Sequence, residues 1–344
     1  MRFTRPGFPL LLIAALLGSS GCATVEPLAE SAREPEPLPR AVADRFCYDA
    51  GPVENTVSLQ KEKRKYRIYD VTLAPGFDGS DDDSPITLEF YEPTGIDSPP
   101  VILVLPILNG QRHLVRPFAT YFAKHGYAAV IVDTLQRRTL LEDLVEPEAA
   151  IRRTVKRHGR VLDWIDGQPS LDSDRIGVFG ASLGGFNALY LAALDERVRA
   201  VVPALVAGDL PYVMLHSTER RIVEAVEAAK QELSMTDDEL QTYLGDQLET
   251  DLLTLAPHVN PDRVLMVLAR RDDAVPYEKQ RELREALGYP EAVFLPSGHV
   301  SAAVYLFYLR SRALDFFDRT LTEDDQRSVA RLPPTHCQSA PPGT

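Results

Sequence analysis

The stretch Gly180-Ala181-Ser182-Leu183-Gly184 decides the fold, because it is a G-x-S-x-G motif in the context that such a motif requires. Residues 174–179 before it are typical of a short buried strand, and residues 185–194 after it are typical of a helix. Between a strand and a helix the motif forms a turn so tight that only glycine fits at its flanking positions. We therefore expect Ser182 to stand exposed at the C-terminal edge of a sheet, as a nucleophile.

Strand and helix patterns alternate over residues 60–321, which favours an α/β fold with a mostly parallel sheet and helices on both faces. Eight strands are expected, at 66–73, 86–91, 101–106, 128–132, 174–179, 198–206, 263–269 and 292–295. A closing helix is expected at 304–321, with an apolar face in the core formed by Val304, Phe307, Tyr308 and Leu314.

The segment 208–261 interrupts the alternation, because it stays helical and supplies no strand. Thr236-Asp237-Asp238-Glu239 is a capping box that opens one of its helices. An insert at this point of the chain leaves the sheet at the edge that carries Ser182. We expect it to form a lid over the site, and the alternative is a helical elaboration packed away from the pocket.

A serine nucleophile needs a base within hydrogen-bond reach and a third group that orients the base. His299 is the expected base, because it lies in a short loop after the last strand, at the same edge as Ser182. Asp272 is the expected acid in a D-x-x-V-P turn after the preceding strand, and Asp273 is its competitor. The order Ser182, Asp272, His299 is the order of triad residues in α/β-hydrolases.

The developing oxyanion needs two backbone N–H donors. The amide of Leu183, directly after the nucleophile, is one candidate, and the amide of Ile107, after the strand 101–106, is the other. No His/Cys cluster has metal-ligand spacing, so no metal is expected.

From about residue 60 to 321 the chain resembles α/β-hydrolases of the dienelactone-hydrolase-like branch. The resemblance rests on the elbow at 180–185, the turn at 272–276 and the ending Ser297-Gly298-His299. It implies an α/β-hydrolase fold and the oxyanion donors Leu183 and Ile107. Dienelactone hydrolases carry cysteine as nucleophile and lack a long helical insert, so both departures favour an esterase relative with a different substrate.

The expected activity is that of a serine hydrolase, most simply a carboxylic ester hydrolase that forms an acyl-enzyme and needs no cofactor. Its partner would be a small-molecule ester. Two alternatives remain open: a serine peptidase of the prolyl-oligopeptidase kind, and a non-catalytic envelope lipoprotein that has kept the hydrolase fold. The formal charge of −13 and the lack of a basic patch in the sequence argue against nucleic acid as a partner.

Residues 1–21 have the features of a bacterial lipoprotein signal peptide: arginines, a short apolar run and small residues before Cys22. We expect Cys22 to be lipidated and to anchor the protein in the cell envelope, in the outer membrane, facing the periplasm or the cell surface. Ordinary signal cleavage, giving a periplasmic or secreted protein, is the alternative. Residues 22–59 are expected to form a Pro/Glu-rich tether and N-terminal segment, and residues 322–344 a polar, Pro-rich tail.

Two further cysteines, Cys47 and Cys337, lie near the two ends of the mature chain. In an oxidising compartment they could form a disulfide that joins the termini. Two free thiols are the alternative.

Overall fold

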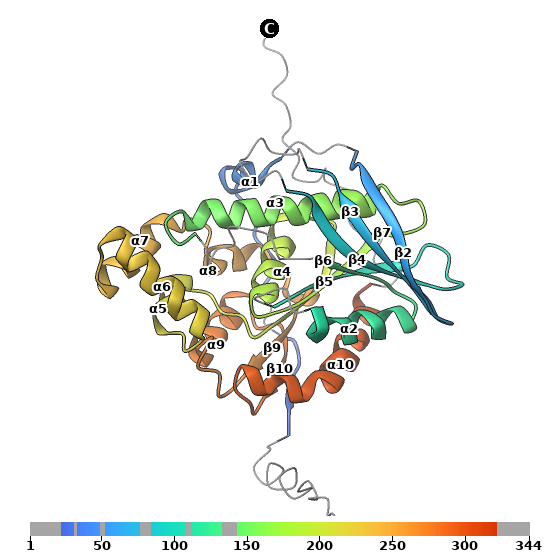
Figure 1. The fold of residues 1–344 in the computed structure, drawn as a ribbon. Helices are drawn as coiled ribbons and strands as arrows, with labels where there is room; N and C mark the ends of the chain where they lie inside the picture. Colours follow the sequence, from blue (N-terminus) through green and yellow to red (C-terminus); the bar gives the residue numbers. More distant parts are fainter. Residues whose placement is uncertain are drawn as a thin grey trace, which may run out of the picture.

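A ten-stranded sheet organises the computed structural model, which describes residues 22–30, 33–48, 52–75, 84–107, 112–132 and 143–321 (Figure 1). The strand order is β1-β10-β9-β8-β7-β5-β6-β4-β3-β2. The strands are β1 (Thr24–Glu26), β2 (Asn55–Glu62), β3 (Tyr66–Leu73), β4 (Ile86–Pro93), β5 (Pro100–Leu105), β6 (Ala128–Val132), β7 (Asp172–Ala181), β8 (Val198–Ala204), β9 (Leu265–Ala269) and β10 (Glu291–Leu295).

The six adjacent strands β10, β9, β8, β7, β5 and β6 run parallel. β1 pairs antiparallel with β10 at one edge, and β4, β3 and β2 continue the sheet beyond β6 in antiparallel pairs. The central strands β5 and β7 are largely buried because helices cover both faces of the sheet. The parallel arrangement brings the C-terminal ends of β7, β9 and β10 to one edge. The α/β-hydrolase fold expected from the sequence is therefore confirmed.

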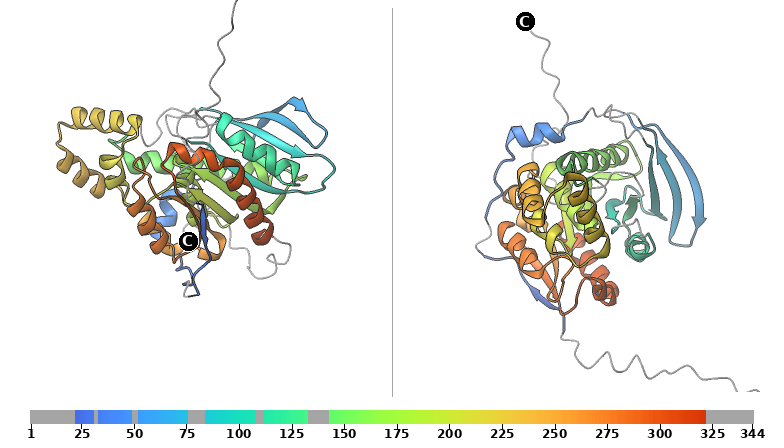
Figure 2. Two further views of the ribbon diagram at one scale, coloured as in Figure 1. Left: turned by 90° about the horizontal axis from the view of Figure 1, so that it is seen from below. Right: turned by 60° about the vertical axis from the view of Figure 1, so that its left-hand side comes forward.

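The helices form two layers around the sheet (Figures 1 and 2). Side chains of α3 and α4 belong to one hydrophobic core, and side chains of α2 and α10 belong to a second core on the opposite face. The helices are α1 (Arg40–Phe46), α2 (Arg112–Lys124), α3 (Pro147–Asp166), α4 (Leu183–Leu194), α5 (Leu210–His216), α6 (Arg220–Leu233), α7 (Asp237–Gln247), α8 (Leu252–Leu255), α9 (Tyr277–Ala286) and α10 (Leu306–Thr320), with a 3-10 helix, η5 (Val300–Tyr305), before α10.

The predicted number of eight strands is wrong, because the sheet also contains β1 and β2. β1 lies in the segment 22–59, which the sequence predicts to be a Pro/Glu-rich tether and N-terminal segment, and β2 begins in that segment and ends at Glu62. β1 pairs with β10, and β2 pairs with β3 as an edge strand. Every residue of β2 is exposed, and Val57 and Leu59 are its only apolar residues, so its pattern is too short to identify a half-buried strand.

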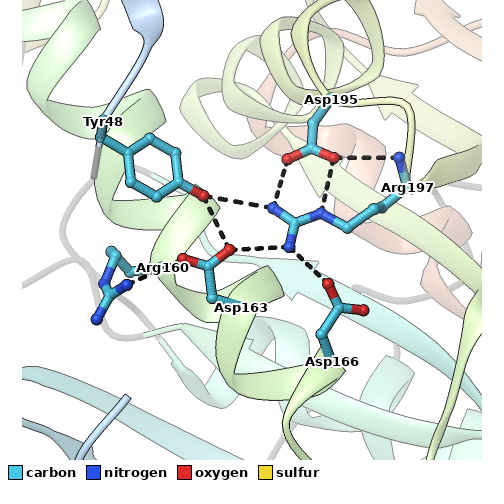
Figure 3. Close-up of polar contacts among 6 residues, drawn as sticks. All are labelled: Tyr48, Arg160, Asp163, Asp166, Asp195 and Arg197. Carbon is cyan, nitrogen blue, oxygen red and sulfur yellow. Dashed lines mark hydrogen bonds and ion pairs between the residues drawn. The ribbon is translucent and has the colours of Figure 1, made fainter. Parts of the chain in front are cut away.

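The end of α1 is also fixed to the domain, by a network of polar side chains (Figure 3). The Tyr48 hydroxyl donates a hydrogen bond to Asp163 at 3.0 Å, and Arg197 contacts the same carboxylate at 2.9 Å and Asp195 at 2.7 Å. The Tyr48 ring packs on Gly159, where a Cβ would lie 2.6 Å from ring atoms. The part of the N-terminal segment around Tyr48 is therefore packed against the domain.

The insert 208–261 is helical, as expected, and contains α5 to α8. The predicted capping box opens α7: Glu239 accepts a hydrogen bond from the Thr236 amide at 2.9 Å, and the Thr236 hydroxyl accepts one from the Glu239 amide at 3.4 Å. The expected apolar face of the last helix is only partly correct. Leu314 is buried, but Val304 and Phe307 are exposed to solvent.

The predicted signal peptide (1–21) and C-terminal tail (322–344) lie outside the described residues. Within the described part of the chain, none of the helices has both the length and the apolar composition needed to cross a bilayer.

Candidate active site

Ser182 sits on the predicted turn between β7 and α4. Its backbone has φ 53° and ψ −123°, a conformation that L-residues rarely adopt and that costs about 1–3 kcal/mol. A Cβ at position 180 would lie 2.1 Å from the carbonyl oxygen of Gly184, and one at position 184 would lie 2.3 Å from that of Leu105. The two glycines of the motif therefore allow the close backbone contacts that hold Ser182 in this strained position.

His299 and Ser182 are neighbours although 117 residues separate them in the sequence. The His299 Nε2 atom lies 3.1 Å from Ser182 Oγ, within hydrogen-bond distance. His299 lies after β10 and directly before η5, so the last strand brings its ring to the edge at which β7 ends. This arrangement allows the imidazole to take up the proton of the serine hydroxyl.

Asp272, rather than its competitor Asp273, faces His299. The Asp272 Oδ2 atom lies 2.8 Å from His299 Nδ1, and Oδ1 accepts hydrogen bonds from the amides of Ala274 (3.1 Å) and Val275 (2.9 Å). Asp272 is buried, whereas Asp273 is exposed. The structure thus brings the three predicted side chains together in one chain of hydrogen bonds.

Gln280 is a part of the site that the sequence reasoning missed. Its side chain is fully buried in α9, and its Nε2 atom donates to Asp272 Oδ2 at 3.0 Å and to the carbonyl oxygen of Val275 at 2.7 Å. Its Oε1 atom accepts from the amide of Ala269 at 3.1 Å. The available signal was a glutamine on the same helix face as the apolar residue Leu283, since a buried amide needs hydrogen-bond partners.

Ser182 and His299 open onto an apolar cavity of about 430 Å³. Its lining residues are Ile107, Leu114, Val115, Phe118, Phe179, Ala181, Ser182, Ala204, Leu205, Glu219, Ile222, Ala274, Val275, His299, Val300, Ala302, Ala303, Leu306 and Leu309. Among the lining residues that the structure describes, only Glu219 and His299 have titratable side chains, so the cavity favours apolar ligand groups.

The two predicted oxyanion donors lie next to this cavity. Leu183 is the first residue of α4, directly after Ser182, and Ile107 is one of the lining residues. The remainder of the loop, 108–111, lies outside the described residues.

The insert reaches the cavity through α6. Ile222 lines it, and so does Glu219, whose carboxylate caps α6 by accepting from the amides of Arg221 (2.7 Å) and Ile222 (3.1 Å). The Thr218 amide also donates to the carbonyl oxygen of Asp273 at 3.2 Å. The beginning of α6 is thereby attached to the loop that carries Asp272.

The remaining predicted residues lie elsewhere. Cys22 is exposed and free, Cys47 follows α1, and Cys337 lies outside the described residues. In the described part of the chain, no group of three or more His, Cys, Asp or Glu side chains is arranged to hold a metal ion.

Proteins similar to this chain have the same fold. Acetyl xylan esterase 1 from Thermoanaerobacterium sp. superposes with a TM-score of 0.63 at 17% identity, covering 85% of this chain and 96% of the other. The acetyl xylan esterase from Paenibacillus sp. R4 superposes with a TM-score of 0.58 at 20% identity, covering 82% and 92%.

Among curated sequences, an uncharacterized 31.7 kDa protein of Escherichia coli is 30% identical over 131 residues, which are 36% of this chain and 43% of that protein. The chain thus matches less than half the length of that relative. The polyketide transferase ATR5 of Stachybotrys chlorohalonatus is 24% identical over 253 residues, 61% of this chain and 84% of that protein.

A family model also matches most of the chain. The model of the X-Pro dipeptidyl-peptidase (S15) family covers residues 25–287, which include Ser182 and Asp272. The chain therefore belongs to the X-Pro dipeptidyl-peptidase (S15) family, and it has the α/β-hydrolase fold of a serine hydrolase.

Proposed function

We propose that this protein is a serine hydrolase that cleaves carboxylic esters through an acyl-enzyme. One observation carries the proposal: the hydrogen-bonded series Ser182–His299–Asp272 lies at an apolar cavity, with distances of 3.1 and 2.8 Å. A serine alone is a weak nucleophile, and this arrangement supplies both the base and its orienting group.

In the proposed mechanism His299 Nε2 takes the proton of Ser182 as Oγ attacks the ester carbonyl. Asp272 holds the imidazole by its Nδ1–H and stabilises the imidazolium that forms. The amides of Leu183 and Ile107 donate to the oxyanion of the tetrahedral intermediate. The C–O bond to the alcohol then breaks and the alcohol leaves with the proton of His299. Water, activated by the same histidine, releases the acid and restores the serine.

The apolar lining of the cavity favours an ester with an apolar acyl or alcohol group. The esterase names of the structural neighbours point the same way. Family membership favours a second candidate, a peptidase that cleaves after proline. Both activities would use the same nucleophile and the same base, so they differ only in the scissile bond.

Kinetics on two substrate sets separate the candidates. We expect p-nitrophenyl esters to be hydrolysed with a far higher kcat/KM than X-Pro-p-nitroanilides, and Ser182→Ala to lose ester turnover by several orders of magnitude with the fold intact. Preferred cleavage of the anilides would favour the peptidase. Near-native ester turnover by folded Ser182→Ala would contradict a mechanism in which Ser182 is the nucleophile.

We also propose that the insert 208–261 is a lid that sets substrate size. The support is that Glu219 and Ile222 of the insert line the cavity. Replacing Ile222 by Trp should lower kcat/KM for butyryl and longer p-nitrophenyl esters more than for the acetyl ester. Val223→Trp, at an exposed neighbouring position, is the control. An equal effect of Ile222→Trp on kcat/KM for esters of all chain lengths would contradict the proposal that the insert is a lid.

For the two ends of the chain we propose an envelope lipoprotein with lipidated Cys22 and a Cys47–Cys337 disulfide. Cys22 is exposed and free, so it is accessible at the start of β1 and leaves Cys47 and Cys337 as the possible pair. Membrane fractions should contain the wild type but not Cys22→Ser, if Cys22 is lipidated.

Thiol alkylation before and after reduction tests the Cys47–Cys337 disulfide, and reduction should reveal two additional thiols. Equal solubility of both proteins, or no additional thiols, would contradict the respective proposal.

A further inference from the structure

The mouth of the cavity opens beside an exposed apolar surface on η5 and α10. Val300, Val304 and Phe307 have exposed fractions of 86%, 80% and 68%, the highest of all large apolar side chains in the described residues. We call these three residues the rim patch. Val300 itself lines the cavity, so the patch is continuous with the substrate opening. Isolated exposed apolar residues are ordinary, but a cluster of this kind marks a contact surface.

A second surface lies next to the rim patch, in an open groove of about 560 Å³ along α2. We call it the basic groove. It is lined by His113, Arg116, Pro117, Thr120, Tyr121, Lys124, His125 and Arg310. None of these residues is acidic, in a chain whose formal charge is −13. The groove is therefore a local exception to the overall negative charge.

Two cations of the basic groove differ from Arg116 in having no ion-pair partner among the described residues. Arg116 is paired with Glu89 at 2.6 Å. Lys124 and Arg310, in contrast, form no ion pair with a carboxylate of the described residues. Both side chains are thus available to an anionic partner.

Arg310 joins the groove to the rim patch. Its guanidinium carbon lies 4.5 Å from the ring centroid of Tyr121 in the groove and 4.5 Å from that of Phe307 in the patch. Figure 2 shows α2 and α10 side by side, and their residues share one hydrophobic core. The apolar and the basic residues therefore form one continuous surface beside the cavity mouth.

We propose that the rim patch and the basic groove together dock the protein on an anionic lipid surface, with the cavity mouth facing the lipid. Exposed side chains such as Phe307 and Val304 can enter the boundary between headgroups and acyl chains, while Lys124 and Arg310 lie near the phosphates. This pairing of apolar and cationic groups matches the chemistry of an anionic bilayer surface. The proposal goes beyond ester hydrolysis and does not require it.

The start of the described chain is on the same side. β1 pairs with β10 at the sheet edge, and Figure 1 shows this first segment emerging at the lower side, next to α10. A lipid on Cys22, two residues before β1, would therefore be compatible with the proposed orientation. The docking surface itself consists only of α2, η5 and α10.

Vesicle flotation tests the proposal with the full chain in a Cys22→Ser background, so that no lipid anchor contributes. Vesicles of phosphatidylcholine alone are compared with vesicles that also contain phosphatidylglycerol. Val304→Ser/Phe307→Ser removes the apolar contacts, and Lys124→Gln/Arg310→Gln removes the free charges. Val57→Ser/Leu59→Ser is the matched apolar control, since both residues are 54% exposed on β2. Lys61→Gln/Lys63→Gln is the charge control on the same hairpin.

We expect binding to the anionic vesicles, weakened at least about tenfold by either rim or groove variant and by high salt, and unchanged in both controls. Hydrolysis of p-nitrophenyl acetate should be the same in all five proteins, which separates docking from catalysis. Equal vesicle binding by the Cys22→Ser parent and by Val304→Ser/Phe307→Ser would overturn the proposal, as would an equal loss of binding in the controls. A dimer of the Cys22→Ser parent that Val304→Ser/Phe307→Ser converts to a monomer in sedimentation would also overturn it, because the patch would then join two copies.

Discussion

Gln280 Nε2 donates a hydrogen bond of 3.0 Å to Asp272 Oδ2, the same carboxylate oxygen that accepts from His299 Nδ1. The amides of Ala274 and Val275 occupy the other oxygen. Asp272 is therefore held on both sides, by the turn that precedes α9 and by a side chain of α9 itself. The orientation of the imidazole depends on this buried hydrogen-bond arrangement.

Gln280→Met should lower kcat about 10- to 100-fold with little change in KM, because a hydrogen bond to a charged group contributes about 1.5–3 kcal/mol. It should also lower the free energy of unfolding by about 1–3 kcal/mol, since the Ala269 amide loses its buried acceptor. Gln247→Met, exposed at the end of α7, is the control. Steady-state kinetics on folded Gln280→Met measure the effect, and an unchanged kcat would contradict a role of Gln280 in positioning Asp272.

Asp272→Asn should reduce kcat by roughly 10³- to 10⁴-fold, because an amide that donates toward Nδ1 favours the wrong tautomer of His299. Asp273→Asn should change kcat by less than about twofold, since the side chain of Asp273 is exposed. The two variants are compared with one ester at saturating concentration. The reverse ranking would transfer the orienting role to Asp273.

Gly184→Ala should destabilise the protein by more than about 3 kcal/mol, because the added Cβ would lie 2.3 Å from the backbone oxygen of Leu105. Gly245→Ala is the matched control in α7, where a Cβ meets nothing within 4 Å. That control should be neutral or more stable by up to about 1 kcal/mol. Thermal unfolding followed by circular dichroism measures both, and equal melting temperatures would show that the elbow tolerates a side chain.

Acid should destabilise the protein through His158. Burial lowers the pKa of His158 to about 4, so the native state keeps this ring neutral while the unfolded chain binds a proton below its ordinary value of 6.5. The free energy of unfolding should therefore fall between about pH 6.5 and pH 4, by on the order of 3 kcal/mol from this group.

Chemical denaturation at several pH values measures this effect. His158→Gln should have a flatter pH dependence than the wild type, whereas His216→Gln, at an exposed position, should not. Identical slopes in the wild type and His158→Gln would contradict the assignment.

The sequence predicts the site residues because three of them follow parallel strands. Ser182, Asp272 and His299 lie in the turns and loops that follow β7, β9 and β10, and parallel strands end at one edge whatever the chain does between them. Gly180 and Gly184 mark the elbow because no other residue fits. These features depend on local geometry, and the sequence alone indicates them.

Other features depend on tertiary contacts, which a local sequence pattern does not indicate. Gln280 differs from an exposed helix residue only through the partners that surround it in the fold. β2 is exposed along its whole length and has only two apolar residues, so its short pattern does not identify a strand. Val304 and Phe307 have the spacing of a core face, and only the structure places them in solvent beside the cavity.

The most direct test of the central claim is active-site labelling with a fluorophosphonate followed by mass spectrometry of the digested protein. A serine hydrolase with this geometry should carry one phosphonyl group, on the peptide that contains Ser182, and folded Ser182→Ala should carry none. His299→Ala should label far more slowly, because the hydroxyl loses its base at 3.1 Å. A folded wild-type protein without an adduct, or equal labelling of Ser182→Ala, would contradict the assignment of Ser182 as the nucleophile.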